Sequence, residues 1–335
     1  MNKLMIYGAL GYTGRMAAAR AKETGLTLVV GGREGAPLQA LAAALGVEYR
    51  VFALDAAADV ERALQDITVL LNCAGPFVYT ARPLMEACLR TGTHYLDIAA
   101  ELDSYQLAEQ RDREAVDAGV MLMPGSGGSV AMLGSLAARA VERAVAPVSL
   151  HIALHVSGAM SRGSAISASR HLTMQCLRRK GDVLTARDPG ELRDFDFGHG
   201  PASCFPVTLP DLITLARQTG IGDVDTYVHV SGSAFSEGGI DALPDGPTAQ
   251  ERADHRYQAA VEVVGADGTI TRAVLDTVNG YTFTPLAAVE AARRVLSGEA
   301  RPGFQTPVGV FGSGFAETIA DTCITAPAST SAAAD

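Results

Sequence analysis

The sequence predicts an α/β protein in which a doubly wound parallel sheet precedes an α+β domain built on a mostly antiparallel sheet. Apolar, strand-like runs alternate with helix-like segments over residues 1–146, which is typical of parallel strands joined by right-handed crossovers. A glycine-rich turn directly follows the first of these runs. From residue 147 the alternation gives way to strand-like runs that include a hairpin pattern. These observations predict two domains, residues 1–146 and 147–312.

The first domain carries the number of strands that a complete doubly wound, Rossmann-type sheet needs. The intervening segments 56–66, 82–91 and 102–118 have helical spacing. Six runs are expected to be the strands: Leu4–Tyr7, Leu26–Val30, Arg50–Ala53, Val69–Asn72, His94–Ile98 and Val120–Met123.

The second domain combines strands and helices in a different order. Its strands are expected at Ser149–Ser157, at Val224–Val230, and in a hairpin of Tyr257–Val264 with Thr269–Val278. Helices are expected at Gly163–Arg179, Asp211–Thr219 and 285–298. Residues 313–325 are expected to form a C-terminal helix that could pack on the first domain. Residues 326–335, rich in Ala, Ser and Thr, are expected to be a disordered tail.

The turn after the first strand has the spacing G-x-x-G-x-x-G, at Gly8, Gly11 and Gly14. A strand, a glycine turn and a helix in succession present backbone N–H groups to a pyrophosphate at the helix N-terminus. Gly8 would make the tight turn, Gly11 would admit the phosphates, and Gly14 would let the helix pack closely on the strand. The sequence therefore predicts dinucleotide binding, and a purely structural turn is the alternative. The other residues of this expected cradle are Leu10, Tyr12, Thr13 and Arg15.

Charges at the end of the second strand favour NADP over NAD. Arg33 follows that strand, and arginine offers a planar fork of donors that suits a 2′-phosphate. Arg15 could add a second cation. Glu34 is the counter-argument, since an acid turned inward would bind the ribose hydroxyls of NAD. Asp55, at the end of the third strand, either reaches the adenine or is a solvated acid.

Ligands of such sheets bind beyond the carboxyl ends of the strands. The loop of Cys73, Ala74, Gly75 and Pro76, which follows the fourth strand and Asn72, is therefore expected beside the nicotinamide. A reductase also needs a proton donor there. Tyr79, His94 and Asp97 are the candidate catalytic residues, with Tyr95 and Glu101 as further possibilities. A packed or solvent-facing role is the alternative for His94.

Composition excludes several other classes of function. The chain has 335 residues, is 48% hydrophobic, carries a net charge of −10 and has no basic block, which argues against nucleic-acid and anionic membrane partners. The five cysteines form no C-x-x-C pair, so neither a metal site nor a disulfide framework is expected. No apolar run reaches the length of a membrane span, and strand one leaves no room for a signal peptide. We expect a soluble cytoplasmic protein, a homodimer, with a small-molecule substrate.

Several segments together resemble the saccharopine dehydrogenase-like oxidoreductases, including their trans-acting enoyl reductase branch. The resemblance is most specific in the first 100 residues and looser afterwards. Two positions depart from the family pattern: Thr80 stands where glycine is usual, and Ala99-Ala100 stands where Thr-Gly is usual. The matching stretches are 8–14, 31–33, 72–77, 83–84, 87–88, 92–97 through Glu101, 161–165, 219–221, 280–281 and 303–307.

The resemblance implies a Rossmann domain, an appended α+β domain and NAD(P)-dependent hydride transfer. The expected reaction is reduction of a C=C, C=N or C=O bond of a small organic substrate with NADPH. Glu101, Arg162, His171 and Tyr281 are the candidate substrate contacts. Two alternatives stay open. An opine- or saccharopine-type amino-acid dehydrogenase would need a cation fork for carboxylates, at Arg162 or Arg170. A non-catalytic NADP sensor would need the phosphate cradle without a proton donor.

Overall fold

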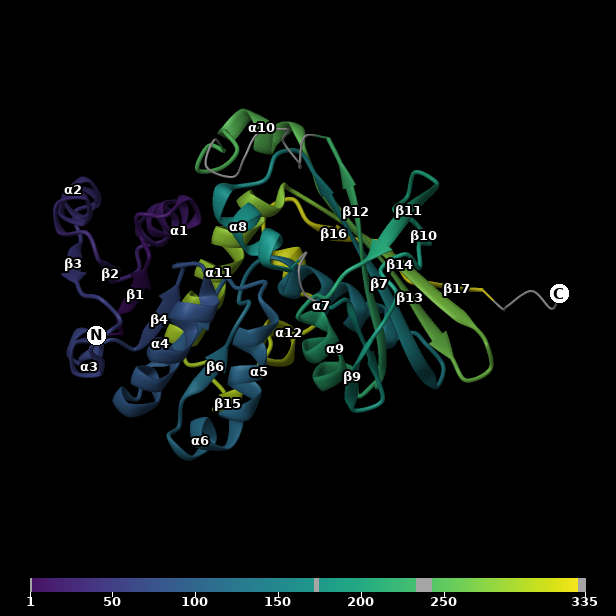
Figure 1. Cartoon of the computed structure of the whole chain (residues 1–335), viewed down its shortest axis with the longest axis horizontal. Coiled ribbons are helices and arrows are strands. Elements are labelled where there is room, and N and C mark those ends of the chain that lie inside the picture. Colours follow the sequence, from purple (N-terminus) through teal and green to yellow (C-terminus); the bar gives the residue numbers. More distant parts are fainter. Residues whose placement is uncertain (1, 172–174, 233–242, 331–335) are drawn as a thin grey trace. The chain divides into compact units, whose positions relative to one another are not determined.

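The computed structural model describes residues 2–171, 175–232 and 243–330, and for residues 168–171 it describes the backbone alone. The chain divides into two compact units (Figure 1). The first unit holds Met1–Gly128 and Thr284–Val310, and the second holds Ser129–Phe283 and Phe311–Asp335. The boundaries expected at residues 146 and 312 differ from this division, because residues 129–146 belong to the second unit and residues 284–310 return to the first.

The first unit is built on a parallel sheet of seven strands in the order β15-β6-β5-β4-β1-β2-β3. The order of β1 to β6 is that of a doubly wound Rossmann sheet, so the predicted fold class is confirmed. Strands β1 and β4 are buried along their whole length, as expected where helices cover both faces of a parallel sheet. The strands are β1 (Leu4–Tyr7), β2 (Leu28–Gly32), β3 (Glu48–Val51), β4 (Val69–Asn72), β5 (His94–Asp97), β6 (Met121–Met123) and β15 (Gly303–Phe304).

Helices follow these strands in sequence (Figure 1). Alanine on one side of α1 (Tyr12–Glu23) lets that helix pack closely, with Ala17, Ala18 and Ala21 buried. Gly92, in the left-handed conformation, ends α4 (Phe77–Thr91). The other helices of this unit are α2 (Gly35–Leu45), α3 (Ala57–Leu64), α5 (Leu102–Gln110) and α6 (Asp112–Asp117), with most of α11 (Gly280–Leu296) and α12 (Pro307–Phe311).

The second unit is built on a ten-stranded mixed sheet with the central order β10-β11-β12-β7-β13-β14-β16. Strands β7 and β12 are parallel, and the other pairs are antiparallel, as predicted for this domain. The hairpin of β13 with β14 is found where the sequence predicts it. The strands are β7 (Pro147–Ser157), β8 (Leu177–Lys180), β9 (Val183–Ala186), β10 (Arg193–Asp196), β11 (Pro201–Pro206), β12 (Asp223–Ser231), β13 (Tyr257–Gly265), β14 (Ile270–Thr277), β16 (Cys323–Ile324) and β17 (Ala328–Thr330).

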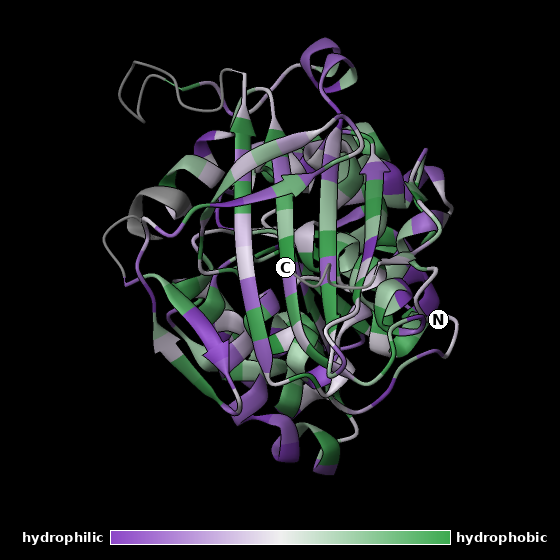
Figure 2. Cartoon of the chain, turned by 90° about the vertical axis from the view of Figure 1, so that its right-hand side faces the viewer, coloured by the Kyte–Doolittle hydropathy of each residue, from purple (hydrophilic) through white to green (hydrophobic). Residues whose placement is uncertain are grey.

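Helices pack on this second sheet. Helix α7 (Ser129–Val141) packs against β7, β13 and β14, and α9 (Asp211–Thr219) packs against α7 and β12. Figure 2 shows apolar and polar bands along the long strands of this sheet. Along β7, Leu150, Ile152 and Leu154 are buried on one face, as alternation along a strand requires. The remaining elements are α8 (Arg162–His171), α10 (Ala249–Asp254) and the 3₁₀ turn η2 (Ala316–Thr318).

Three expected elements are wrong. The helix expected over Gly163–Arg179 ends at His171, and Leu177–Lys180 is strand β8, paired with β9 across a turn at Gly181. The helix expected over 313–325 is absent: this stretch holds η2 and β16 instead. Residues 328–330, expected to be disordered, form β17 against β14. In each case pairing with a distant strand decides the local structure.

Candidate coenzyme and active site

The glycine turn after β1 approaches neighbouring backbone closely at two positions. Gly8 has a positive φ of 80°, and a Cβ there would lie 2.7 Å from the Ala74 nitrogen. A Cβ on Gly14 would lie 2.2 Å from the Gly8 carbonyl oxygen. Gly11 is the N-cap of α1 and provides no side-chain cap. Because the first N–H groups of a helix lack partners within the helix, this uncapped end can receive an anion.

We expect Gly14→Ala to lower the free energy of unfolding by about 1–3 kcal/mol, because the added methyl group forces the turn apart. The thermal unfolding midpoint measures this effect. Gly163→Ala is the matched control: this helical glycine has a negative φ, and the nearest atom to an added Cβ is 3.9 Å away. The control should be neutral or stabilising. Equal midpoints for the two variants would show that the turn tolerates a side chain at Gly14.

The residues around the end of β2 carry opposite charges. Arg33 is exposed directly after β2, and neither Arg33 nor Arg15 forms an ion pair with any residue that the structure describes. Burial raises the pKa of Tyr7, while the charge of Arg33 lowers it and that of Asp55 raises it again. The charges of Arg33 and Asp55 thus both act on the Tyr7 hydroxyl group, which also contacts the Phe52 carbonyl at 3.4 Å. An unpaired guanidinium at this point can accept a phosphate group.

The loop after β4 is held by a buried hydrogen-bond network. The Ala74 N–H group donates to Asn72 Oδ1 at 3.0 Å, and the Thr80 hydroxyl donates to the Ala74 carbonyl at 2.7 Å. Asn72 Nδ2 donates to Thr80 Oγ1 at 3.1 Å and to the Tyr95 hydroxyl at 3.2 Å. Cys73 is buried, and burial raises the pKa of its thiol. The loop Cys73–Pro76 thus lies against the glycine turn through Ala74.

Asp97 continues the same network at the end of β5. It accepts hydrogen bonds from the Tyr95 hydroxyl at 2.8 Å and from the N–H groups of Ala99 and Gly125 at 2.9 and 2.7 Å. Its side chain is fully buried, and burial raises its pKa to about 6, although the two N–H groups act in the opposite direction. Since every partner of its carboxylate is a donor, Asp97 holds the loops after β5 and β6 together. These contacts do not support the predicted role of Asp97 as proton donor.

The other candidate acids occupy three different environments. His94 lies at the amino end of β5, opposite the edge that carries the glycine turn, and its Nδ1 accepts from the Met121 N–H at 3.1 Å. This placement gives no support to a catalytic role for His94, which stays a prediction. Glu101 is buried and accepts from the Val78 N–H at 2.9 Å, which caps the first turn of α4. Tyr79, in the same turn, is 64% exposed.

Two of the predicted substrate contacts in the second unit, Arg162 and Tyr281, bond to other groups of the protein. Arg162 Nε donates to the Leu243 carbonyl at 2.8 Å, and its Nη1 lies 3.6 Å from Asp245. The Tyr281 hydroxyl accepts from the Ser161 N–H at 2.8 Å. These hydrogen bonds hold loops in place, and substrate binding by the two side chains stays a prediction. The side chain of His171 lies outside the described residues.

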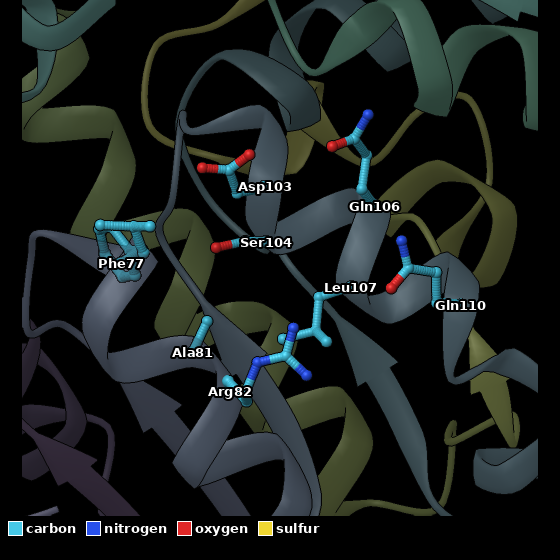
Figure 3. A pocket seen from close by; sticks show the side chains of 9 residues that line it. Phe77, Ala81, Arg82, Asp103, Ser104, Gln106, Leu107 and Gln110 are labelled. Atoms are coloured by element: carbon cyan, nitrogen blue, oxygen red, sulfur yellow. The ribbon is translucent and has the colours of Figure 1, made fainter.

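A cavity of about 230 Å³ lies between α4 and α5. Figure 3 shows side chains from both helices around it. The hydroxyl of Ser104, on α5, is buried without a hydrogen-bond partner in the described part of the chain. None of the residues predicted for the coenzyme or the substrate lines this cavity. Its lining residues are Phe77, Val78, Ala81, Arg82, Asp103, Ser104, Gln106, Leu107 and Gln110.

Neither a metal-binding cluster nor a membrane-spanning helix is found within the described ranges. No group of three or more His, Cys, Asp or Glu side chains there could hold a metal ion. No helix among the described residues has the length and apolar character that crossing a membrane requires.

Comparisons with known proteins point to one family. Residues 4–123 match the model of the saccharopine dehydrogenase NADP binding domain. A saccharopine dehydrogenase-like oxidoreductase from Homo sapiens is 28% identical over 144 residues, which cover 37% of this chain and 34% of that protein. A trans-acting enoyl reductase from Mycobacterium leprae (strain TN) is 30% identical over 106 residues, which cover 30% of this chain and 25% of that protein. The matches thus span about a third or less of the curated relatives.

Among solved structures, the fold is similar to that of the apo, histidine-tagged saccharopine dehydrogenase (L-Glu forming) from Saccharomyces cerevisiae. The TM-score is 0.66 at 12% sequence identity, and the match covers 97% of this chain and 100% of the other. At this identity the likeness concerns the fold alone. The resemblance predicted from the sequence is therefore confirmed: residues 4–123 match the NADP-binding domain of the saccharopine dehydrogenase family, on a fold similar to that of a saccharopine dehydrogenase.

Proposed function

We propose that this chain is an NADP(H)-dependent oxidoreductase that transfers a hydride to a C=C, C=N or C=O bond of a small organic substrate. The observation that carries the proposal is the uncapped N-terminus of α1 behind the glycine turn, with Arg33, which forms no ion pair with the described residues, after the neighbouring strand. The family model that matches residues 4–123 supports the choice of NADP.

The residues present fit such a coenzyme. Gly8 and Gly14 leave no room for side chains, so the turn is tight, and the N-terminus of α1 that follows it would face the diphosphate. Leu10, Tyr12 and Thr13 belong to this turn, and Arg15 stands exposed on the first turn of α1. Arg33 would bind the 2′-phosphate, and Asp55 would lie on the adenine side. The bound coenzyme would supply the hydride.

The chain's own residues would orient the reacting groups and provide a proton. Cys73–Pro76 would form the wall beside the nicotinamide, held by Asn72. Reduction of a double bond adds the hydride to one atom and a proton to the other. Among the candidate acids we assign the proton to Tyr79, since it is exposed in the first turn after this loop, whereas Asp97 is enclosed by donors.

The amino-acid dehydrogenase alternative gains nothing from Arg162. That reading needs a guanidinium available for carboxylates, but Arg162 is engaged by the Leu243 carbonyl and Asp245. Arg170, the other candidate, has a side chain outside the described residues.

Titration calorimetry of the purified chain with NADPH and with NADH tests the proposed function. We expect saturable binding of both coenzymes, with the lower dissociation constant for NADPH. Loss of the NADPH heat in a variant carrying Gly14→Val would locate binding at the glycine turn, because the Cβ of the valine would lie within 2.2 Å of the Gly8 carbonyl. No heat with either coenzyme would refute the proposal.

A further inference from the structure

We propose that Thr80 is a positioning residue that fixes the loop Cys73–Pro76 against the glycine turn, an inference that rests on the proposed coenzyme function. Thr80 lies in the first helical turns of α4, beyond the loop itself. The family resemblance places glycine at this position, and glycine has no hydroxyl to offer.

Both polar groups of the Ala74 residue are held by side chains. Its N–H group donates to Asn72 Oδ1, and its carbonyl oxygen accepts from the Thr80 hydroxyl. The two side chains also bond to each other, because Asn72 Nδ2 donates to Thr80 Oγ1 at 3.1 Å. This closed ring of three hydrogen bonds leaves the backbone at Ala74 a single orientation.

The position of Ala74 matters because its backbone touches the glycine turn. A Cβ on Gly8 would lie 2.8 Å from both the Cα and the Cβ of Ala74, so the two loops are packed without spare room. A rotation at Ala74 would move it into or away from Gly8. The hydroxyl of Thr80 therefore acts on the coenzyme cradle through Ala74, without being part of it.

The ring is anchored on its other side by buried groups. The second hydrogen of Asn72 Nδ2 goes to the Tyr95 hydroxyl, which donates to Asp97 Oδ2. Asn72, Tyr95 and Asp97 are all fully buried. Asn72 cannot turn without losing these bonds. The ring of hydrogen bonds is therefore completed by the Thr80 hydroxyl, whose hydrogen can rotate toward the Ala74 carbonyl.

Two measurements on Thr80→Val test the inference: hydrogen–deuterium exchange over residues 73–77 without coenzyme, and the dissociation constant of NADPH. Valine keeps the shape and removes both hydrogen bonds. We expect faster exchange in this loop and binding weakened by about fivefold, the effect of losing one or two hydrogen bonds that position a site. Thr80→Ser, which keeps the hydroxyl, should stay within about twofold of the parent.

Thr91→Val is the matched control. Thr91 lies at the other end of the same helix, and its hydroxyl also bonds within the protein, to the Ala87 carbonyl at 2.9 Å and to Thr93. This variant should lower the unfolding midpoint without changing exchange at 73–77 or NADPH affinity. If Thr80→Val proves unstable, Thr80→Ala replaces it.

Unchanged exchange at 73–77, or an unchanged NADPH dissociation constant, in the Thr80 variant would overturn the inference. So would a Thr91 variant that weakens binding equally, since the effect would then be general to α4. Failure of the parent chain to bind NADPH would instead refute the proposed function, and the exchange measurement alone would then decide whether Thr80 fixes the loop.

Discussion

Replacing Arg33 with alanine is expected to weaken NADPH binding by roughly 30-fold, the effect of losing a charge-assisted hydrogen bond to one phosphate. The same variant should weaken NADH binding by less than about threefold. The physical reason is that Arg33 forms no ion pair with the described residues, so its charge is available to a ligand. Only NADPH carries the additional 2′-phosphate. Titration calorimetry with both coenzymes measures the two effects on the same preparation.

The charge change itself needs a control. Arg113→Ala removes the same charge from a side chain that is 88% exposed and pairs with Asp117 on α6. It should leave both dissociation constants unchanged. Arg33→Lys keeps the charge but loses the planar fork, so its affinity for NADPH should fall between those of the parent and the alanine variant. Equal losses of NADPH and NADH in Arg33→Ala would refute the assignment of the phosphate.

The first unit could be predicted well because its signals are local. Buried parallel strands appear as short apolar runs in the sequence. A tight turn between strand and helix requires glycine, so Gly8 and Gly14 predict the turn in which they lie. Strand β15 could not be found this way. It has two residues, and it exists because Gly303 and Phe304 pair with Met121 and Leu122 from a distant part of the chain.

The second unit shows where a local pattern loses to distant pairing. Leu177–Lys180 has the composition of a helix end, yet it is β8, and the Arg178 guanidinium within it bonds to the buried Asp225 of β12 at 2.6 Å. A buried carboxylate such as that of Asp225 requires charged or polar partners. The spacing of apolar residues along Leu177–Lys180 does not indicate that Arg178 is one of them. The same holds for the 313–325 stretch, in which β16 pairs with β14.

In the candidate site, too, some residues could be predicted from local sequence patterns and others could not. The glycine turn and the loop Cys73–Pro76, whose predicted roles depend on the backbone, lie side by side in the structure. Residues whose role depends on side-chain direction could not be assigned from sequence. Arg162 and Tyr281, for example, bond to the Leu243 carbonyl and the Ser161 N–H group, which no sequence pattern indicates. Thr80 was visible in the sequence only as a departure from a family pattern, and its hydrogen bonds explain what it contributes.

A second large effect is expected in the second unit, at Asp211 on α9. Its side chain is fully buried, and neither carboxylate oxygen has a hydrogen-bond partner in the described part of the chain. The hydroxyl of Thr214, one turn further on, is unpartnered there as well. Burial raises the pKa of Asp211 to about 7, although the residue's own backbone N–H group acts in the opposite direction. A buried, unpaired carboxylate is costly, and protonation removes most of that cost.

The raised pKa fixes the sign of the pH dependence. In the unfolded chain an aspartate titrates near pH 4, so between about pH 4 and pH 7 the folded protein binds the extra proton. The contribution of Asp211 to the free energy of unfolding is therefore fully present below about pH 4, and it is lost as the pH rises through about 7. The difference between the pKa values of the folded and unfolded states corresponds to about 4 kcal/mol of unfolding free energy. Asp211→Asn cannot ionise, so we expect it to stabilise the protein by a few kcal/mol at pH 8 and by little at pH 4.

Urea unfolding of Asp211→Asn and the parent at pH 4 and pH 8 measures this difference. Asp223→Asn is the opposite control: Asp223 is paired with Lys180 at 2.7 Å, and that hydrogen bond lowers its pKa. Removing its charge should give no stabilisation at pH 8. If Asp211→Asn raises the free energy of unfolding as much at pH 4 as at pH 8, ionisation of Asp211 is not the cause. The shape or hydrogen bonding of the side chain would then explain the gain. A loss of stability at pH 8 would mean instead that the carboxylate is stabilised in the folded state, contrary to its enclosure without partners.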